Sequence, residues 1–304
     1  MIVSKYKKIV FLFYLISICG YGQIATYNQY PTLKPSHILD EKLTDISFAF
    51  SMRVLESDYV GPLIRLRRAG DNAEQDFGWG DNDIVDIVAI NAWRGANNVF
   101  VHTWYDQSGL NRHAIQTTQN RQPRFYPNTF PYFQGDGSND HLIIDTPNGI
   151  QDMTTNGDRG TVIGVMRATR KSQHTFGVLW GSNRWSAHVN WSNQNLYFDP
   201  GICCNPTRSF NNNANVNVWE IYSFIKTNTN SIARSGGVQR FNGAYIRGRC
   251  TRTEDFAIGW ATGNQSGNHA TTSFNEFIMY KVDINATEYQ EIEENSITDR
   301  KSVV

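Results

Sequence analysis

The chain has 304 residues, which is enough for one large β-domain or two small domains. Lys and Arg together number 28, and Asp and Glu also number 28, so the formal net charge is zero. A neutral chain gives no reason to expect electrostatic attraction to nucleic acid or to an anionic membrane. Charged residues make up 18% of the chain and aromatic residues 13%, which fits a packed β-sandwich with most tryptophans in its core.

Residues 1–22 are predicted to be a signal peptide. Three lysines near the start form a positively charged region, and Ile9 to Ile18 is an apolar run too short to span a membrane comfortably. Small residues precede Gln23, where we expect cleavage. Cys19 is not preceded by a small residue, which argues against a lipoprotein anchor. We therefore expect a soluble mature protein that is secreted or held at the cell surface, with no membrane insertion.

The first elements of the mature chain follow from apolar periodicity. Residues 23–45 are predicted to be a loose lead-in segment, and Ile46 to Leu55 a short helix. Apolar and basic residues alternate over 64–67, which predicts a half-exposed strand. Asp83 to Ala92 has the apolar stripe of a short helix, and Val99 to Tyr105 is predicted to be a strand that ends in turn residues.

Short apolar runs separated by Asn-, Gly- and Ser-rich loops continue to residue 280. We predict strands at Leu142–Ile144, Thr161–Met166, Thr175–Trp180, Ser186–Val189, Leu196–Phe198, Glu220–Ile225, Ser231–Arg234, Phe256–Gly259 and Phe274–Tyr280. Many short strands without long helices between them predict an all-β sandwich of two antiparallel sheets rather than a parallel α/β fold. Asn285 with Glu288 three residues later predicts a last short helix over 286–295. The sandwich domain is therefore placed at residues 46–298.

Residues 299–304 have the sequence Asp-Arg-Lys-Ser-Val-Val. A widely used sequencing-adapter oligonucleotide encodes this peptide in one frame, followed by a stop codon. We therefore expect the tail to be non-native and the natural protein to continue beyond residue 298. The alternative is an ordinary polar tail, and long-read resequencing of the locus would decide between them.

Several motifs together resemble one known family. They are Thr103–Gly109 with the sequence Thr-Trp-Tyr-Asp-Gln-Ser-Gly, then His113-Ala114, then Arg121–Arg124, and upstream the blocks Gly61–Arg68 and Asp71–Asp76. The chain resembles the catalytic domain of arabinofuranosidase B, an α-L-arabinofuranosidase. This resemblance implies a concanavalin-A-like jelly-roll β-sandwich, of the lectin/glucanase and laminin-G-like kind. It also implies carbohydrate recognition, with an arabinose-containing polysaccharide as the partner.

The mature chain contains the cysteines Cys203, Cys204 and Cys250, an odd number. Domains of the arabinofuranosidase B family carry an adjacent cysteine pair whose disulfide lies against the sugar. The resemblance therefore implies a vicinal disulfide between Cys203 and Cys204, forming a stiff platform for substrate binding. Two buried thiols, or a bond from one of the pair to Cys250, remain the alternatives.

Retaining hydrolysis of a furanoside needs two carboxyl groups about 5–5.5 Å apart. The family's nucleophilic Glu lies in a Met-Glu-Asn context that this chain lacks, and its acid/base Asp lies in a turn that matches Ile258–Asn264, where no carboxylate occurs. Substitute catalytic candidates are Glu220, Glu276 and Asp199, each of which can equally be an ordinary sandwich residue. Asp106 lies within the family motif and is predicted either to cap its turn or to bind the sugar.

An aromatic and basic cluster precedes the cysteine pair and gives the remaining candidates for sugar binding. Its members are Trp180, Arg184, Trp185, His188 and Trp191. If the strands that carry them border one face of the sandwich, their rings can stack on a sugar. The alternative is that the tryptophans belong to the core.

No cofactor is expected, with one weighed exception. The stretch Phe133–Asp140 resembles the Phe-Asp-Gly-x-x-Asp hairpin of laminin-G-like sandwiches, in which Asp136, Asn139 and Asp140 can ligate Ca²⁺. A hairpin without an ion is the alternative. The sequence contains no His-Glu-x-x-His, Cys-x-x-Cys, phosphate-loop or Gly-x-Ser-x-Gly motif. We predict a carbohydrate-recognising domain that can retain arabinofuranosidase activity, or else a noncatalytic adhesion or structural module of a longer cell-surface protein.

Overall fold

The computed structural model describes residues 37–301, apart from 81, 170–172, 246 and 264–266. The predicted signal peptide at 1–22 and most of the lead-in segment at 23–45 lie outside the described residues, as do the last residues of the tail. Within the described part, no helix has the length and apolar character needed to cross a membrane.

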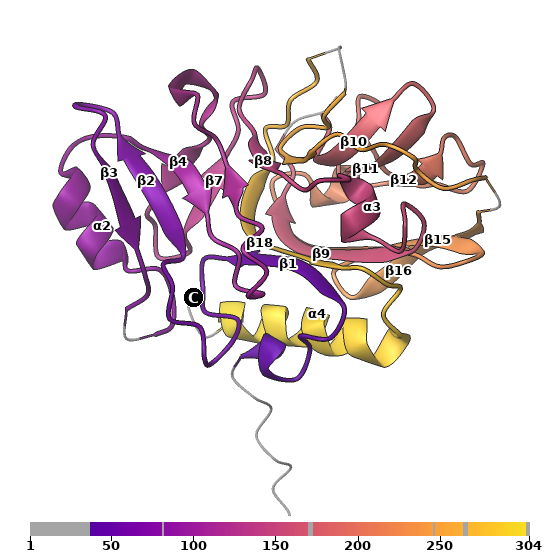
Figure 1. Ribbon diagram of the computed structural model, residues 1–304, viewed down its shortest axis with the longest axis horizontal. Helices are drawn as coiled ribbons and strands as arrows, with labels where there is room; N and C mark the ends of the chain where they lie inside the picture. Colours follow the sequence, from indigo (N-terminus) through magenta and orange to yellow (C-terminus); the bar gives the residue numbers. More distant parts are fainter. Residues whose placement is uncertain (1–36, 81, 170–172, 246, 264–266, 302–304) are drawn as a thin grey trace, which may run out of the picture. The chain divides into compact units, whose positions relative to one another are not determined.

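The described residues form short β-strands with few helices (Figure 1). The strands are β1 (Ile46–Ser51), β2 (Ile64–Arg68), β3 (Glu74–Phe77), β4 (Val99–Trp104), β5 (Ala114–Ile115), β6 (Arg124–Tyr126), β7 (Tyr132–Gln134), β8 (Leu142–Ile144), β9 (Gly160–Arg167), β10 (Phe176–Trp180), β11 (Asn183–His188), β12 (Asn195–Ile202), β13 (Ser209–Asn211), β14 (Trp219–Lys226), β15 (Asn230–Ser235), β16 (Val238–Ala244), β17 (Phe256–Ile258) and β18 (Ser273–Tyr280). The α-helices are α2 (Ile87–Arg94), α3 (Ile150–Met153) and α4 (Ala286–Lys301), and short 3-10 helices occur at Ile38–Asp40, Gln119–Arg121 and Asn213–Asn215.

The strands pair in two antiparallel ladders. One runs β1–β18–β9–β14–β15–β16, and the other runs β5–β8–β17–β10–β11–β12–β13. Strands β3, β2, β4, β6 and β7 form a further antiparallel group that joins the ladders through β4–β5 and β7–β18. The prediction of an all-β jelly-roll sandwich of antiparallel sheets is therefore confirmed.

Aromatic side chains fill the space between the two ladders. Phe48 of β1 lies 6.0 Å from Phe256 of β17, measured between ring centroids, and Phe277 of β18 lies 5.2 Å from Phe176 of β10. Phe224 of β14 lies 5.4 Å from Phe176 in the same way. These rings belong to the main hydrophobic core and are fully buried. Burial of so much aromatic surface is the dominant stabilising contribution to the sandwich.

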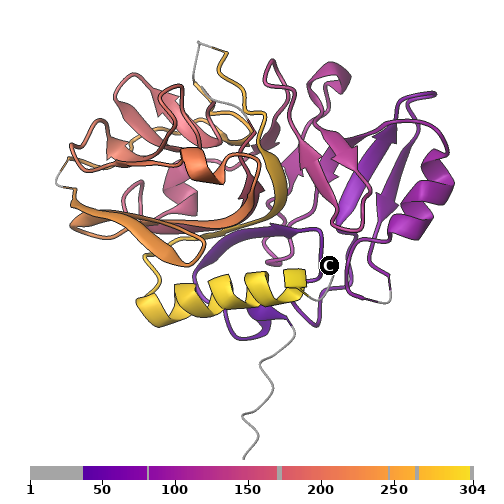
Figure 2. The same ribbon diagram turned by 180° about the vertical axis from the view of Figure 1, so that it is seen from behind.

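Helix α4 covers the opposite face of the first ladder (Figures 1 and 2). Tyr289 and Ile292 of the helix pack in a second apolar cluster with Ile163 of β9 and Ile221 of β14. The helix begins with a capping box, because the Asn285 side chain accepts the Glu288 N–H at 3.1 Å and the Glu288 carboxylate accepts the Asn285 N–H at 3.1 Å. The predicted helix over 286–295 is confirmed and extends to Lys301.

The prediction of a helix over Ile46 to Leu55 is wrong, since this segment contains β1. All six residues of β1 are buried. Phe48 and Phe50 face the main core, whereas Ile46 and Ala49 face the cluster under α4. A strand buried on both faces lacks the polar alternation of a surface strand, so its apolar run resembles that of a buried helix.

Candidate functional site

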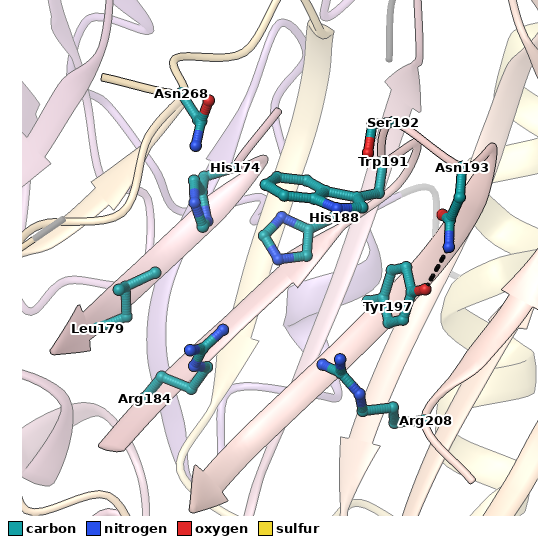
Figure 3. Close-up of a pocket in the computed structure, with 10 residues that line it drawn as sticks. All are labelled: His174, Leu179, Arg184, His188, Trp191, Ser192, Asn193, Tyr197, Arg208 and Asn268. Carbon is teal, nitrogen blue, oxygen red and sulfur yellow. Dashed lines mark hydrogen bonds between the residues drawn. The ribbon is translucent and has the colours of Figure 1, made fainter. Parts of the chain in front are cut away.

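A cavity of about 370 Å³ lies on the face of β10, β11 and β12 that points away from the main core. Strand alternation divides the side chains: Trp185 and Ala187 of β11 enter the core, while Arg184 and His188 line the cavity. The full lining is His174, Leu179, Arg184, His188, Trp191, Ser192, Asn193, Tyr197, Arg208 and Asn268 (Figure 3). This volume lies in the range of small-ligand pockets, about 300–1,000 Å³.

Three rings form one wall of the cavity. The His188 ring lies 4.6 Å from the Trp191 ring and 4.4 Å from the His174 ring, measured between centroids. The Nδ1 atom of His188 lies 2.8 Å from the Gln173 carbonyl oxygen, so Nδ1 donates. Burial lowers the pKa of His188 to about 3 and that of His174 to about 2. Both imidazoles are therefore neutral at physiological pH, and the wall presents flat, uncharged rings to a ligand.

The opposite side of the cavity is basic. Arg184 and Arg208 come from neighbouring parts of the sheet and lie on the same side of the strands as the rings (Figure 3). Between them lies Asp199, which is fully buried and whose Oδ2 is 2.5 Å from Nη1 of Arg208 and 3.8 Å from Nη1 of Arg184. Burial raises the pKa of Asp199, and the two guanidinium groups act in the opposite direction.

Polar groups on the rim are fixed by local contacts. The Asn193 side chain donates to the Tyr197 hydroxyl at 2.6 Å, and the Tyr197 ring lies under the guanidinium of Arg208 at 4.6 Å. Holding the Arg208 guanidinium over this ring orients its N–H donors before any ligand arrives.

The disulfide between Cys203 and Cys204 is formed, as the resemblance implied. A cis peptide bond joins the two residues. Their sulfur atoms and an oxygen of Asp199 lie within 4.8 Å of one another, so the disulfide lies beside the carboxylate that the two arginines contact. Cys250 is a free, buried thiol whose pKa burial raises to about 11, so the alternative pairing with Cys250 does not occur.

The other tryptophans predicted for sugar binding lie away from the cavity lining. Trp185 is fully buried in the main core against Phe176 and Phe198. Trp180 is 52% exposed at the end of β10, with Arg252 over its ring at 5.7 Å. Trp191 is the tryptophan of the predicted group that lines the cavity, together with Arg184 and His188. Asp106 is also outside it: its carboxylate accepts the N–H groups of Ala49, Ser108 and Arg112, and it caps the turn of the family motif.

The structure separates the candidate catalytic carboxylates. Glu276 of β18 is buried beside α4, where its Oε2 lies 2.9 Å from Nε of Arg53. Glu220 is the second residue of β14 in the first ladder and lies against the turn at Gly236, where an added Cβ would be 2.6 Å from its Oε2. Asp199 is the candidate beside the cavity. Among the described residues that line the cavity, none is Asp or Glu.

The hairpin weighed as a Ca²⁺ site uses its carboxylates internally. Oδ1 of Asp136 accepts the N–H groups of Ser138, Asn139 and Asp140 at 2.7–3.3 Å. Oδ2 of Asp140 accepts the Asp136 N–H at 3.1 Å. The side chains hold the hairpin closed by hydrogen bonds, which is the arrangement of a turn stabilised by its own carboxylates.

A grouping of Asp199, Cys203 and Cys204 places three potential metal-ligand atoms close together. The two sulfur atoms are bonded to each other, whereas a metal needs a thiolate ligand. This chemistry does not fit a metal ion while the disulfide is intact.

No protein family matches the chain, and no curated protein matches it. Among solved structures, the chain is similar to an arabinofuranosidase complexed with arabinofuranosyl-α-1,2-xylobiose, with a TM-score of 0.66 and 14% identity over 83% of this chain and 62% of the other. It is also similar to a GH54 α-L-arabinofuranosidase soaked with a cyclic sulfate inhibitor, with a TM-score of 0.64 and 13% identity over 83% of this chain and 62% of the other.

The predicted resemblance to the arabinofuranosidase B domain is confirmed at the level of the fold. This chain spans about 62% of the length of those two structures. At this level of sequence identity, the similarity shows the arrangement of strands alone. It does not show which ligand or reaction the cavity of this chain serves.

The aromatic and basic cluster in the sequence grouped Arg184, His188 and Trp191 but did not include the other lining residues. Those are His174, Leu179, Ser192, Asn193, Tyr197, Arg208 and Asn268. The signal for Tyr197 was present, because it alternates with the apolar Leu196 and Phe198 along β12. Asn268 and His174 come from loops far apart in sequence, joined by a hydrogen bond from the His174 N–H to the Asn268 carbonyl.

Proposed function

We propose that this chain is an exported carbohydrate-binding β-sandwich that binds a glycan in the cavity on β10, β11 and β12 without hydrolysing it. The observation that carries the proposal is the lining itself, in which flat rings face polar and basic donors. Aromatic rings with hydrogen-bond donors around them are suited to the apolar face and hydroxyl groups of a sugar. The predicted signal peptide and the Cys203–Cys204 disulfide both favour an exported protein.

We propose that the chain does not hydrolyse the glycan because of where its carboxylates lie. Retaining hydrolysis needs a nucleophile and an acid/base about 5–5.5 Å apart. Asp199 is the carboxylate beside the cavity, and its side chain is inaccessible and paired with Arg208. In sequence, the segments 167–174 and 259–269 that lead to His174 and Asn268 contain no Asp or Glu. A second carboxylate to complete the pair is therefore missing from the described lining.

The test combines a glycan array with hydrolysis assays on arabinan and an aryl α-L-arabinofuranoside. We expect the purified protein to bind oligosaccharides without releasing arabinose. Replacing the cavity ring with Trp191→Ala should weaken binding about fivefold, since an aromatic stacking contact contributes about 1 kcal/mol. The matched control is Trp180→Ala, which removes an exposed indole outside the cavity and should leave binding unchanged.

The other outcomes identify the competing functions. Turnover that disappears in Asp199→Asn would make the chain an arabinofuranosidase. Failure to bind any glycan would favour a structural or adhesion module instead. Binding that Trp180→Ala weakens and Trp191→Ala does not would move the sugar site to the end of β10.

A further inference from the structure

The charge of the cavity lining is positive and comes from arginine alone. His174 and His188 are neutral at physiological pH because burial lowers their pKa values to about 2 and 3. The other described lining residues besides Arg184 and Arg208 are uncharged. A ligand that enters therefore meets two guanidinium groups and no carboxylate on the surface of the lining.

Asp199 cannot neutralise both arginines. It carries one negative charge when ionised, and its Oδ2 is already 2.5 Å from Nη1 of Arg208. Arg184 lies farther away, with Nη1 at 3.8 Å from the same oxygen. The three side chains together therefore keep at least one net positive charge. Burial favours the protonated form of Asp199, which would increase this excess.

The surroundings of Arg184 also leave its charge poorly compensated. Its Nε donates to the Gly181 carbonyl at 3.2 Å and its Nη2 donates to the same oxygen, while the side chain is 19% exposed. Burial lowers the pKa of Arg184, which means that its positive charge has lost solvation. An anionic group in the cavity would replace that solvation with charge-assisted hydrogen bonds.

Resting on the proposed glycan-binding function, we infer that the cavity selects an acidic sugar, whose carboxylate or sulfate group binds Arg184 and Arg208 while its ring lies against Trp191 and His188. A carboxylate and a sulfate ester share the same chemistry here, since each is an anion that can present two oxygen atoms together to a guanidinium fork. Neutral sugars would use the same rings and rim amides but would leave the arginine charge unmatched.

The experiment measures affinity by isothermal titration calorimetry with three probes of similar length. They are a neutral arabino-oligosaccharide, an oligogalacturonate and a sulfated galactan oligosaccharide, each titrated in low and high salt. We expect at least one acidic probe to bind about tenfold more tightly than the neutral probe. Tighter binding of the oligogalacturonate would identify a uronate carboxylate, and tighter binding of the sulfated probe would identify a sulfate ester. Acidic binding should weaken in high salt, because salt screens the charge interaction.

The variant Arg184→Gln tests whether the acidic group of the sugar binds in the cavity. It removes one charge and leaves Asp199 paired with Arg208, and we expect about a tenfold loss of affinity for the acidic probe with little change for the neutral probe. The matched control is Arg65→Gln, which makes the same change of net charge on β2, where Arg65 is paired with Asp76. If Arg184→Gln fails to fold, Arg208→Gln makes the same change of net charge, leaves Asp199 beside Arg184 and provides the same comparison.

The outcomes separate this inference from the proposed function. Equal binding of neutral and acidic probes, unaffected by Arg184→Gln, would overturn the selectivity but leave glycan binding standing. An equal loss in Arg65→Gln and Arg184→Gln would show general electrostatic attraction and would also overturn it. If none of the probes or array glycans bound, the proposed function itself would fail.

Discussion

A substitution of Glu276 can distinguish a structural role of this carboxylate from a catalytic one. It is 2% exposed on β18 and is surrounded by donors: Ser51 and Ser296 donate their hydroxyls at 3.0 and 2.6 Å, and Nε of Arg53 donates at 2.9 Å. Arg53 also donates to the Asn295 side chain at 2.9 Å, which connects β18 to helix α4. The carboxylate therefore holds the helix on the outer face of the first ladder.

The substitution Glu276→Gln keeps the shape of this side chain and removes its charge. Arg53, which is partly buried, then loses its ion pair with Glu276, and breaking a largely buried pair in this way costs about 3–5 kcal/mol. For a domain of this size, that corresponds to a fall in Tm of about 6–20 °C. Chemical denaturation followed by tryptophan fluorescence measures the free energy of unfolding directly. The matched control is Asp71→Asn, which breaks an exposed, solvent-screened pair with Arg68 and should leave the free energy of unfolding nearly unchanged.

The pH dependence of the free energy of unfolding follows from the same contacts of Glu276. Burial alone would raise the pKa of Glu276, but the charge and hydrogen bonds of Arg53, with those of Ser296 and Ser51, lower it overall. The stabilisation is thus present above the ordinary pKa of Glu, about 4.3, and is lost as pH falls through the lower folded-state value. Wild type should lose stability in acid more steeply than Glu276→Gln. Unchanged stability in Glu276→Gln, together with loss of a glycan-cleaving activity, would refute this reasoning and make Glu276 catalytic.

Three further predictions test other parts of the structure. Trp185→Ala should cost about 3–5 kcal/mol of unfolding free energy, because the ring is in the core, and thermal denaturation would show no such loss if the indole were exposed. Burial raises the pKa of Asp140 to about 7. The wild-type protein should therefore lose stability relative to Asp140→Asn as pH rises from about 4 through 7. Parallel curves of Tm against pH for the two proteins would contradict this. Peptide mapping without reductant should find a Cys203–Cys204 bond and label Cys250 alone, and this only after unfolding; two alkylated thiols at 203 and 204 would reject the disulfide.

The fold could be predicted because its main signals are local. Alternation over 64–67 predicted β2, and the capping pair Asn285 and Glu288 predicted the start of α4. The helix expected over Asp83 to Ala92 was found as Ile87–Arg94, where Asp86 caps the first turn by accepting the Ala89 N–H at 2.9 Å. β1 was missed because α4, far away in sequence, buries its second face. The local sequence around β1 does not indicate that contact.

The cavity was only partly predictable for a related reason. Arg184 and His188 share a strand, so their even spacing places them on one face of the sheet. Tyr197 and Arg208 come to the cavity through long-range pairing: Tyr197 stands opposite His188 of β11, and Arg208 directly precedes Ser209 of β13, which stands opposite Tyr197. Register of this kind depends on turn lengths and long-range pairing, which sequence periodicity does not specify.

The position of Asp199 connects the fold to the chemistry proposed for it. Ser186 stands directly opposite Asp199 in the β11–β12 register, so both side chains lie on the cavity face of the sheet, beneath the arginines. A nucleophile must reach the anomeric carbon, but Asp199 has no exposed surface and its Oδ2 is paired with Arg208. Its remaining oxygen, Oδ1, has no partner among the described residues. In this place the carboxylate is positioned to orient the Arg208 guanidinium, which supports the binding role proposed for the cavity.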